Sequence, residues 1–178
     1  MNAVATELRR LRRLAAVTDR RIALANLPGK VAAIDAENRL ARLVIDTDED
    51  GNPVLGPWAT WEEPGVGVLA MHTPLKVGQQ AAYSSPSGTL GAGSSIRPRA
   101  HDDDNPAPST SADTVTFQVG ASWITLNDGE VQISGDTIRL IGNVEVHGAS
   151  LTHNGKNVGD SHAHSNVVNG PAISGPPV

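Results

Sequence analysis

A regular β pattern follows residue 111, repeats every seven residues over residues 123–157, and limits what the chain can fold into. Val115, Phe117 and Val119 precede the blocks of seven with the same alternation. Consecutive blocks read WITLNDG, EVQISGD, TIRLIGN, VEVHGAS and LTHNGKN. Alternation within a block places two apolar residues on one face of a short strand. A coiled coil, the usual meaning of a period of seven, is excluded because every block contains a glycine, which disfavours helix. The apolar pairs are Ile124/Leu126, Val131/Ile133, Ile138/Leu140 and Val144/Val146.

Strands this short cannot bury their apolar faces alone. Each strand offers two inward side chains, and aromatic residues, which bury the most area, make up only 3% of the chain. Three chains wound about one axis would complete each layer, which predicts an intertwined triple-stranded β-prism. A single-chain solenoid is the alternative, but its coils usually need about 20 residues or more. The repeat therefore favours a homotrimer.

Upstream of the repeat, the pattern is that of a small β-barrel or sandwich. Short apolar stretches recur at roughly ten-residue spacing, and residues 48–53 form a strong turn signal between two of them. Residues 27–30 are predicted to be a turn, and residues 66–71 a fully apolar strand. Residues 84–111 are rich in Ser, Pro and Asp and are predicted to be a low-complexity linker.

Residues 1–21 are predicted to form an amphipathic helix with a net charge of +4, against −9 for the rest of the chain. This contrast suggests a docking arm, and nucleic acid is not the expected partner because no aromatic residues accompany the arginines. The seam is too short, and too rich in small residues, for a stable isolated coiled coil. Packing on its own domain, docking onto a partner and packing near a symmetry axis all remain open. The apolar seam, with spacings of four and three, is Val4, Leu8, Leu11, Ala15, Thr18 and Ile22.

No catalytic constellation stands out, and we expect the protein not to be an enzyme. The chain has no Cys, which excludes disulfides and thiolate chemistry. Glu62 and Glu63 should face opposite ways and are predicted to lie in a solvated loop. His72 and Asp46 have no serine partner in a nucleophile elbow. The run His101–Asp104 is predicted to be an exposed loop rather than a metal site, because consecutive aspartates do not converge on one ion.

The end of the chain carries a metal-ligand pattern. His162 and His164 stand two positions apart, so in an extended segment both imidazoles point the same way. Two histidines complete no metal site, but threefold symmetry would supply six nitrogens, which fit an octahedral ion. His147 and His153 are expected to fill or flank the prism instead.

The segment L-T-H-N-G-K-N-V-G-D-S-H-A-H, residues 151–164, resembles the tip of the baseplate assembly protein V family, the central spike of contractile-tailed phages. The order of helix, barrel, β repeat and His-x-His apex is also similar to that family. The resemblance implies an N-terminal helix at 1–21, an OB-fold domain at 22–110, a triple-stranded β-helix at 111–150 and a metal-binding apex at 151–178. It implies that the apex holds one iron ion, with His162 and His164 as its ligands.

The same resemblance implies a homotrimer in the tail baseplate of the virion. Its N-terminal end would dock into the baseplate hub, and its C-terminal tip would meet the host outer membrane. Synthesis in the host cytoplasm is expected, because no apolar run approaches the ~18 residues of a membrane span and no secretory signal is recognisable.

Three other interpretations remain. The tip of a bacterial contractile injection system, or of a bacteriocin, would share the architecture. A spike with lysozyme activity would need an inserted domain and paired catalytic carboxylates, which the sequence does not show. An oligonucleotide- or saccharide-binding OB-fold is disfavoured by the shortage of aromatic stacking residues.

Overall fold

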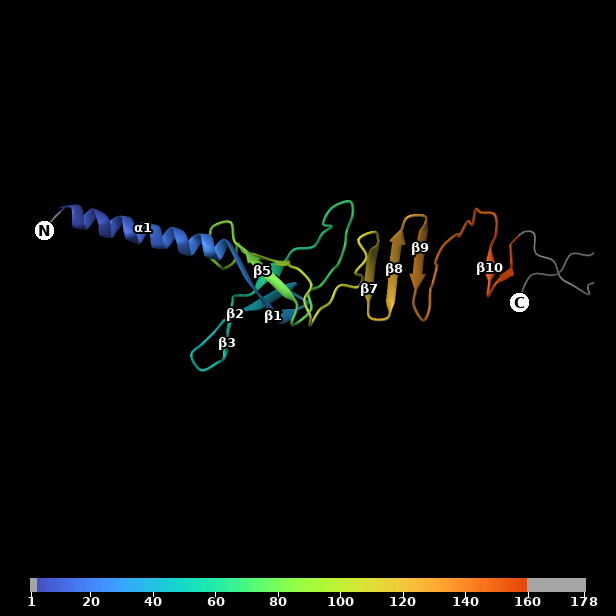
Figure 1. Ribbon diagram of the computed structural model, residues 1–178, viewed down its shortest axis with the longest axis horizontal. Helices are drawn as coiled ribbons and strands as arrows, with labels where there is room; N and C mark the ends of the chain where they lie inside the picture. Colours follow the sequence, from blue (N-terminus) through green and yellow to red (C-terminus); the bar gives the residue numbers. More distant parts are fainter. Residues whose placement is uncertain (1–2, 160–178) are drawn as a thin grey trace, which may run out of the picture.

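The computed structural model describes residues 3–159 and is mainly β, with one N-terminal helix. The elements follow one another along a single long axis (Figure 1): helix α1 at one end, a β-barrel, a three-stranded sheet and a short hairpin. In the described part of the chain, the buried hydrophobic residues all lie in the barrel segment, between Val31 and Ile96. The rest of the described chain therefore has no core of its own.

Helix α1 (Ala3–Ala25) confirms the predicted N-terminal helix and ends four residues beyond the expected boundary. None of its residues is buried, so the helix does not pack its seam on its own domain. Only its C-terminal end touches the barrel, where the Ser85 amide donates to the Ala25 carbonyl (2.9 Å). Within the described range, no helix is long and apolar enough to cross a membrane.

Five strands close into an OB-like barrel, in the ring order β1-β2-β4-β6-β5 and back to β1. Four of the five pairings are antiparallel, and β4 pairs β6 in parallel. Strand β3 (Pro53–Leu55) lies outside the ring and pairs with β2 across the predicted turn at residues 48–53. The ring strands are β1 (Asn26–Asp35), β2 (Leu40–Thr47), β4 (Ala59–Trp61), β5 (Gln80–Ser84) and β6 (Ser95–Pro98).

The turn predicted at residues 27–30 is wrong, because these residues form the first half of β1. This half pairs with β5, the second half pairs with β2, and Lys30 has a partner on each side. A Cβ on Gly29 would lie 2.2 Å from the Val44 carbonyl oxygen. The glycine therefore marks a close approach where β1 passes from one neighbour to the other.

Two other barrel predictions are corrected. Residues 66–71 form no strand but a loop that folds back on itself, held by the Met71 amide on the Gly65 carbonyl (2.9 Å) and by one isolated bridge. Both edges of β4, the preceding strand, are already occupied by β2 and β6. The predicted linker at 84–111 contains β6, whose Ile96 is fully buried.

The barrel interior is small and mostly aliphatic. Tyr83 is fully buried at its centre, where its hydroxyl donates to the Pro57 carbonyl and accepts from the Leu43 amide (3.2 Å). These bonds satisfy the one polar group of the largest fully buried side chain. The surrounding core residues are Val31, Ala41, Leu43, Ala59, Trp61, Leu75, Ala81 and Ile96.

Beyond the barrel, the first part of the β pattern forms strands at the expected positions. They pair with one another within one chain, whereas the sequence predicted winding between three chains from residue 111 on. Strands β7 (Val115–Val119), β8 (Ser122–Asn127) and β9 (Glu130–Ser134) make an antiparallel meander within one chain. Gly120 (φ +57°) and Gly129 (φ +85°) supply the left-handed backbone in its two turns.

The second part of the repeat departs from the prediction. Residues 135–151 carry the expected alternation but form no strand among the described residues. Strand hydrogen bonds need a neighbouring strand, and the described chain supplies none here. A two-residue hairpin follows, β10 (Thr152–His153) and β11 (Lys156–Asn157), with Asn154 and Gly155 at positive φ in its turn.

Candidate functional site

The sheet β7–β9 has one face that is apolar except for Ser122. The register places Phe117 opposite Ile124, and Ile124 opposite Ile133, so the three form a row across all three strands. No element of residues 3–159 covers this row, and between 40% and 54% of each of its residues is exposed. The complete face, named here the shaft face, consists of Val115, Phe117, Val119, Ile124, Leu126, Val131 and Ile133.

The opposite face of the same sheet is mainly polar, with Trp123 as its one large apolar side chain. Thr116 and Thr125 bring their hydroxyl oxygens to 3.3 Å across the strands, and Gln132 is next in that row. The segment entering the sheet lies against this side, where Ser109 and Thr114 bond at 3.0 Å and help to line a shallow pocket. A sheet with one mainly polar face and one exposed apolar face needs a second apolar surface to complete its packing.

The same apolar pattern continues toward the hairpin. Ile138, Leu140, Val144 and Val146 are between 53% and 67% exposed. Because no strand forms here in the described part of the chain, both the side chains and the backbone of residues 137–146 lack the packing that a β pattern requires.

The acidic run after the barrel is partly fixed, not wholly free as predicted. The Asp102 carboxylate accepts hydrogen bonds from Gln80 Nε2 (3.1 Å) and from the Asn105 amide (2.8 Å), and these donors lower the pKa of Asp102. Lys30 Nζ lies 2.6 Å from Asp104 and 3.7 Å from Asp102. This run therefore connects the segment that leads to β7 with strands β1 and β5 of the barrel.

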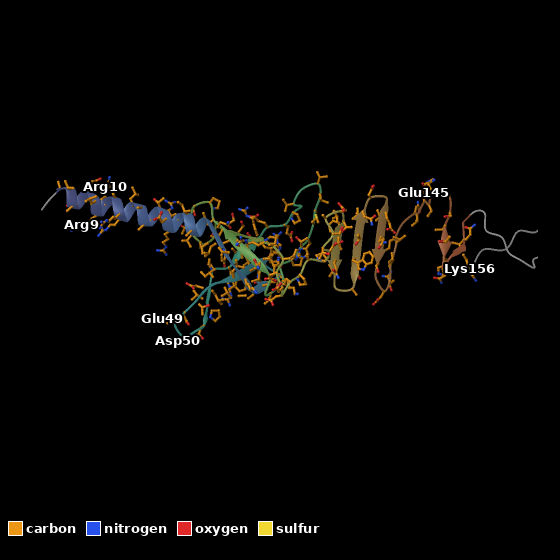
Figure 2. All side chains as sticks on the ribbon, viewed as in Figure 1. Arg9, Arg10, Glu49, Asp50, Glu145 and Lys156 are labelled. Carbon is orange, nitrogen blue, oxygen red and sulfur yellow. The ribbon has the colours of Figure 1, made fainter. Side chains whose placement is uncertain are left out.

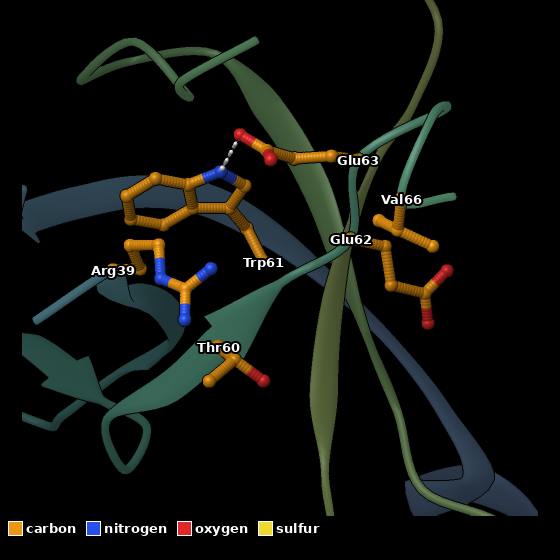
Figure 3. A pocket seen from close by; sticks show the side chains of 6 residues that line it. All are labelled: Arg39, Thr60, Trp61, Glu62, Glu63 and Val66. Atoms are coloured by element: carbon orange, nitrogen blue, oxygen red, sulfur yellow. Dashed lines mark hydrogen bonds between the residues drawn. The ribbon is translucent and has the colours of Figure 1, made fainter. Parts of the chain in front are cut away.

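The two neighbouring carboxylates, Glu62 and Glu63, point in different directions, as predicted (Figure 3). They are not simply solvated. Glu63 is 14% exposed and accepts from Trp61 Nε1 (3.2 Å) and the Thr73 amide (3.2 Å), and its Oε1 lies 2.8 Å from His72 Nδ1. Glu62 pairs with Arg97 of β6 (3.3 Å). Glu62 thus links the end of β4 to β6, and Glu63 links the end of β4 to Thr73, across the loop between them.

A pH prediction follows from Glu63. The indole N–H of Trp61, followed by the Thr73 amide and His72, lowers the pKa of Glu63 below its ordinary value of 4.5. A lowered pKa means that the ionised carboxylate stabilises the fold above pH 4.5, and that this stabilisation is lost as the pH falls through the lower, folded-state value. Trp61 fluorescence should therefore change in acid, below the ordinary titration of glutamate.

The Glu63→Gln variant is the matched control, because it keeps an oxygen acceptor for Trp61 and cannot ionise. Its acid fluorescence change should be smaller than that of the unaltered protein. An identical change in both proteins would contradict a role for Glu63.

The predicted metal ligands His162 and His164 lie outside the described residues. The two other histidines of this region are exposed. His147 Nε2 is 3.6 Å from Glu145, and His153 is in β10, paired in register with Lys156. Within residues 3–159, no group of three or more His, Asp or Glu side chains could hold a metal ion. Comparison with family models and with curated proteins finds no match for this chain.

Proposed function

We propose that this chain is the central spike of a contractile phage tail, a structural homotrimer that pierces the host outer membrane. The observation that carries the proposal is the shaft face: seven apolar residues on one side of a sheet whose other side is mainly polar. An apolar face of this size, left bare on an elongated chain, needs a partner surface. Two further copies of the same sheet supply it.

Threefold packing accounts for both faces of the sheet. Three sheets arranged as the walls of a prism turn their shaft faces inward and place Thr116, Thr125 and Gln132 on the outside. Burying the exposed half of a large aliphatic or aromatic side chain contributes about 1 kcal/mol. Seven such residues contribute on the order of 7 kcal/mol for each chain, which is comparable with the cost of association.

The intertwined part of the shaft is proposed for residues 135–150. Here the apolar alternation persists while the described chain offers no strand partner. Strands from the two other copies would satisfy these backbone groups, which gives a triple-stranded β-helix beyond the three-walled prism. Interwoven chains cannot separate one at a time, so a load along the axis is shared by all three.

The tip is proposed to be closed by iron. The donor set fits this ion, because His162 and His164 from three chains offer six imidazole nitrogens, and imidazole is a ligand for iron as well as for other transition metals. When bound, the ion would cross-link three chains where the shaft is too narrow for an apolar core. These residues hold the chain ends together and perform no reaction.

The opposite end is proposed to dock into the baseplate hub. It carries the basic helix α1, with a net charge of +4 over residues 1–21, on an acidic body. We propose the mechanical roles of the parts in this order: α1 and the barrel attach to the tail, the prism carries the load, and the apex makes first contact with the host membrane.

Purified contractile particles from the source organism test this proposal. The chain should be present in intact tails at three copies per particle, counted by mass spectrometry with isotope-labelled peptides, and should remain in the baseplate fraction after the sheath is removed. Recovery of the chain only outside the particles would contradict the proposal.

A further inference from the structure

Helix α1 exposes an apolar seam along its whole length. The helix runs for 23 residues away from the barrel (Figure 1), and its side chains at Leu8, Leu11 and Ile22 are 52%, 47% and 68% exposed. The arginines avoid this seam. Arg9 and Arg13 fall on the opposite side of a 3.6-residue helix, and Figure 2 shows Arg9 and Arg10 on different sides of α1. Only one side of the helix is therefore suited to burial.

The barrel fixes the direction of the helix. Strand β1 begins at Asn26, directly after the last residue of α1, so no flexible linker separates the two. Arg21 Nε donates to the Ser87 carbonyl (3.0 Å), and a Cβ on Gly88 would lie 2.5 Å from the Arg21 carbonyl oxygen. The seam therefore projects from the barrel at a defined place.

We infer that the α1 helices of three copies pack against one another in parallel, seam to seam, as a short bundle. The inference rests on the proposed trimer, which brings three helices to one end with the same direction. The surface that packs against the seam is thus the same seam on another copy of this chain. The chemistry of the seam fits a second copy, since its aliphatic residues can pack together and its small residues Ala15 and Thr18 allow close approach of the helices.

The charges beside the seam favour the parallel arrangement. With Leu8, Ala15 and Ile22 at one core position of the heptad, Glu7 and Arg12 flank the seam on its two sides. In parallel helices, a residue on one flank faces the residue five positions later on its neighbour. Glu7 therefore faces Arg12 of the next copy. Within one chain, Glu7 Oε1 also lies 2.9 Å from Arg10 Nη2. The Glu7 carboxylate can therefore pair with Arg10 of its own chain and with Arg12 of the next copy.

Because the seam is short, we expect the helices to associate only after the rest of the three chains has assembled. A helix of this size is marginal alone, and fewer than three heptads give weak association. Connection to a trimeric body raises the local concentration of the helices, which turns a weak contact into a stable one. The bundle would extend the load-bearing axis of the spike to its attached end.

Single cysteines test the bundle, because the natural chain has none. In the full-length protein, Leu11→Cys places a thiol in the seam, and Arg13→Cys places one on the opposite side of the same helix turn. Both positions are exposed in one chain, so neither change should unfold it. After mild oxidation with copper phenanthroline, a denaturing gel should show disulfide-linked pairs for Leu11→Cys, absent after reduction, and few for Arg13→Cys.

Light scattering on the same samples separates this inference from the proposed function. A trimer in which Leu11→Cys does not cross-link would overturn the helix bundle and leave the spike intact. A monomer without cross-links would overturn both. Equal cross-linking at the two positions would also overturn the bundle, because it would report random collisions of α1.

Discussion

The Ile133→Asp variant is expected to be monomeric, whereas the unaltered chain and the Gln132→Asp variant form trimers. Ile133 and Gln132 are neighbours on β9, both are exposed in a single chain, and they point to opposite faces of the sheet. Packing between copies is what makes the two substitutions differ in oligomeric state. In the trimer, a carboxylate at 133 would be buried among the shaft faces of three chains, at a cost of roughly 3 kcal/mol or more for each.

A cost of this size is about a hundredfold in the association constant for each chain. Multi-angle light scattering at micromolar concentration measures the result. The barrel is a built-in control for folding, because neither residue contacts its core. The near-ultraviolet circular dichroism of buried Tyr83 and Trp61 should be alike in both variants. If both variants keep the same mass, the shaft face is not the trimer interface.

Replacing both His162 and His164 by Ala is expected to remove the bound iron completely while the shaft stays trimeric. The unaltered protein should carry one ion for three chains, because six imidazoles saturate one octahedral ion. The shaft face should keep the chains together without the metal. Elemental analysis of the protein, purified after expression with added iron, gives the metal content, and light scattering gives the mass.

His153→Ala is the matched control for the metal site. His153 is close in sequence to the proposed ligands but lies in the β10–β11 hairpin, so its removal should leave the iron content unchanged. Retention of iron by the double variant would contradict the assignment of His162 and His164. Loss of iron in His153→Ala would add this residue to the ligand set.

The parts of the fold that depend on local pattern could be predicted from the sequence. The four-and-three spacing from Val4 to Ile22 predicted α1, and the i, i+2 alternation predicted that an apolar pair such as Ile124/Leu126 lies on one face of its strand. Both patterns reflect the geometry of a single element. The structure confirms them, including the exposure that makes the shaft face a candidate interface.

The parts that depend on neighbouring strands could not be predicted in this way. Pro28 and Gly29 look like a turn, but β1 uses them where it passes from β5 to β2. Residues 66–71 look like a strand, but neither edge of β4 is open to them. The bonds of Glu63 to Trp61, His72 and Thr73 arise from the same tertiary context.

The mass of the native protein tests the spike most directly. Every proposed part depends on threefold symmetry: the prism needs three shaft faces, the apex needs six imidazoles, and the helix bundle needs three seams. Sedimentation or native mass spectrometry of the full-length chain should give three times 18.5 kDa. A stable monomer of 18.5 kDa would contradict the prism, the metal apex and the spike together.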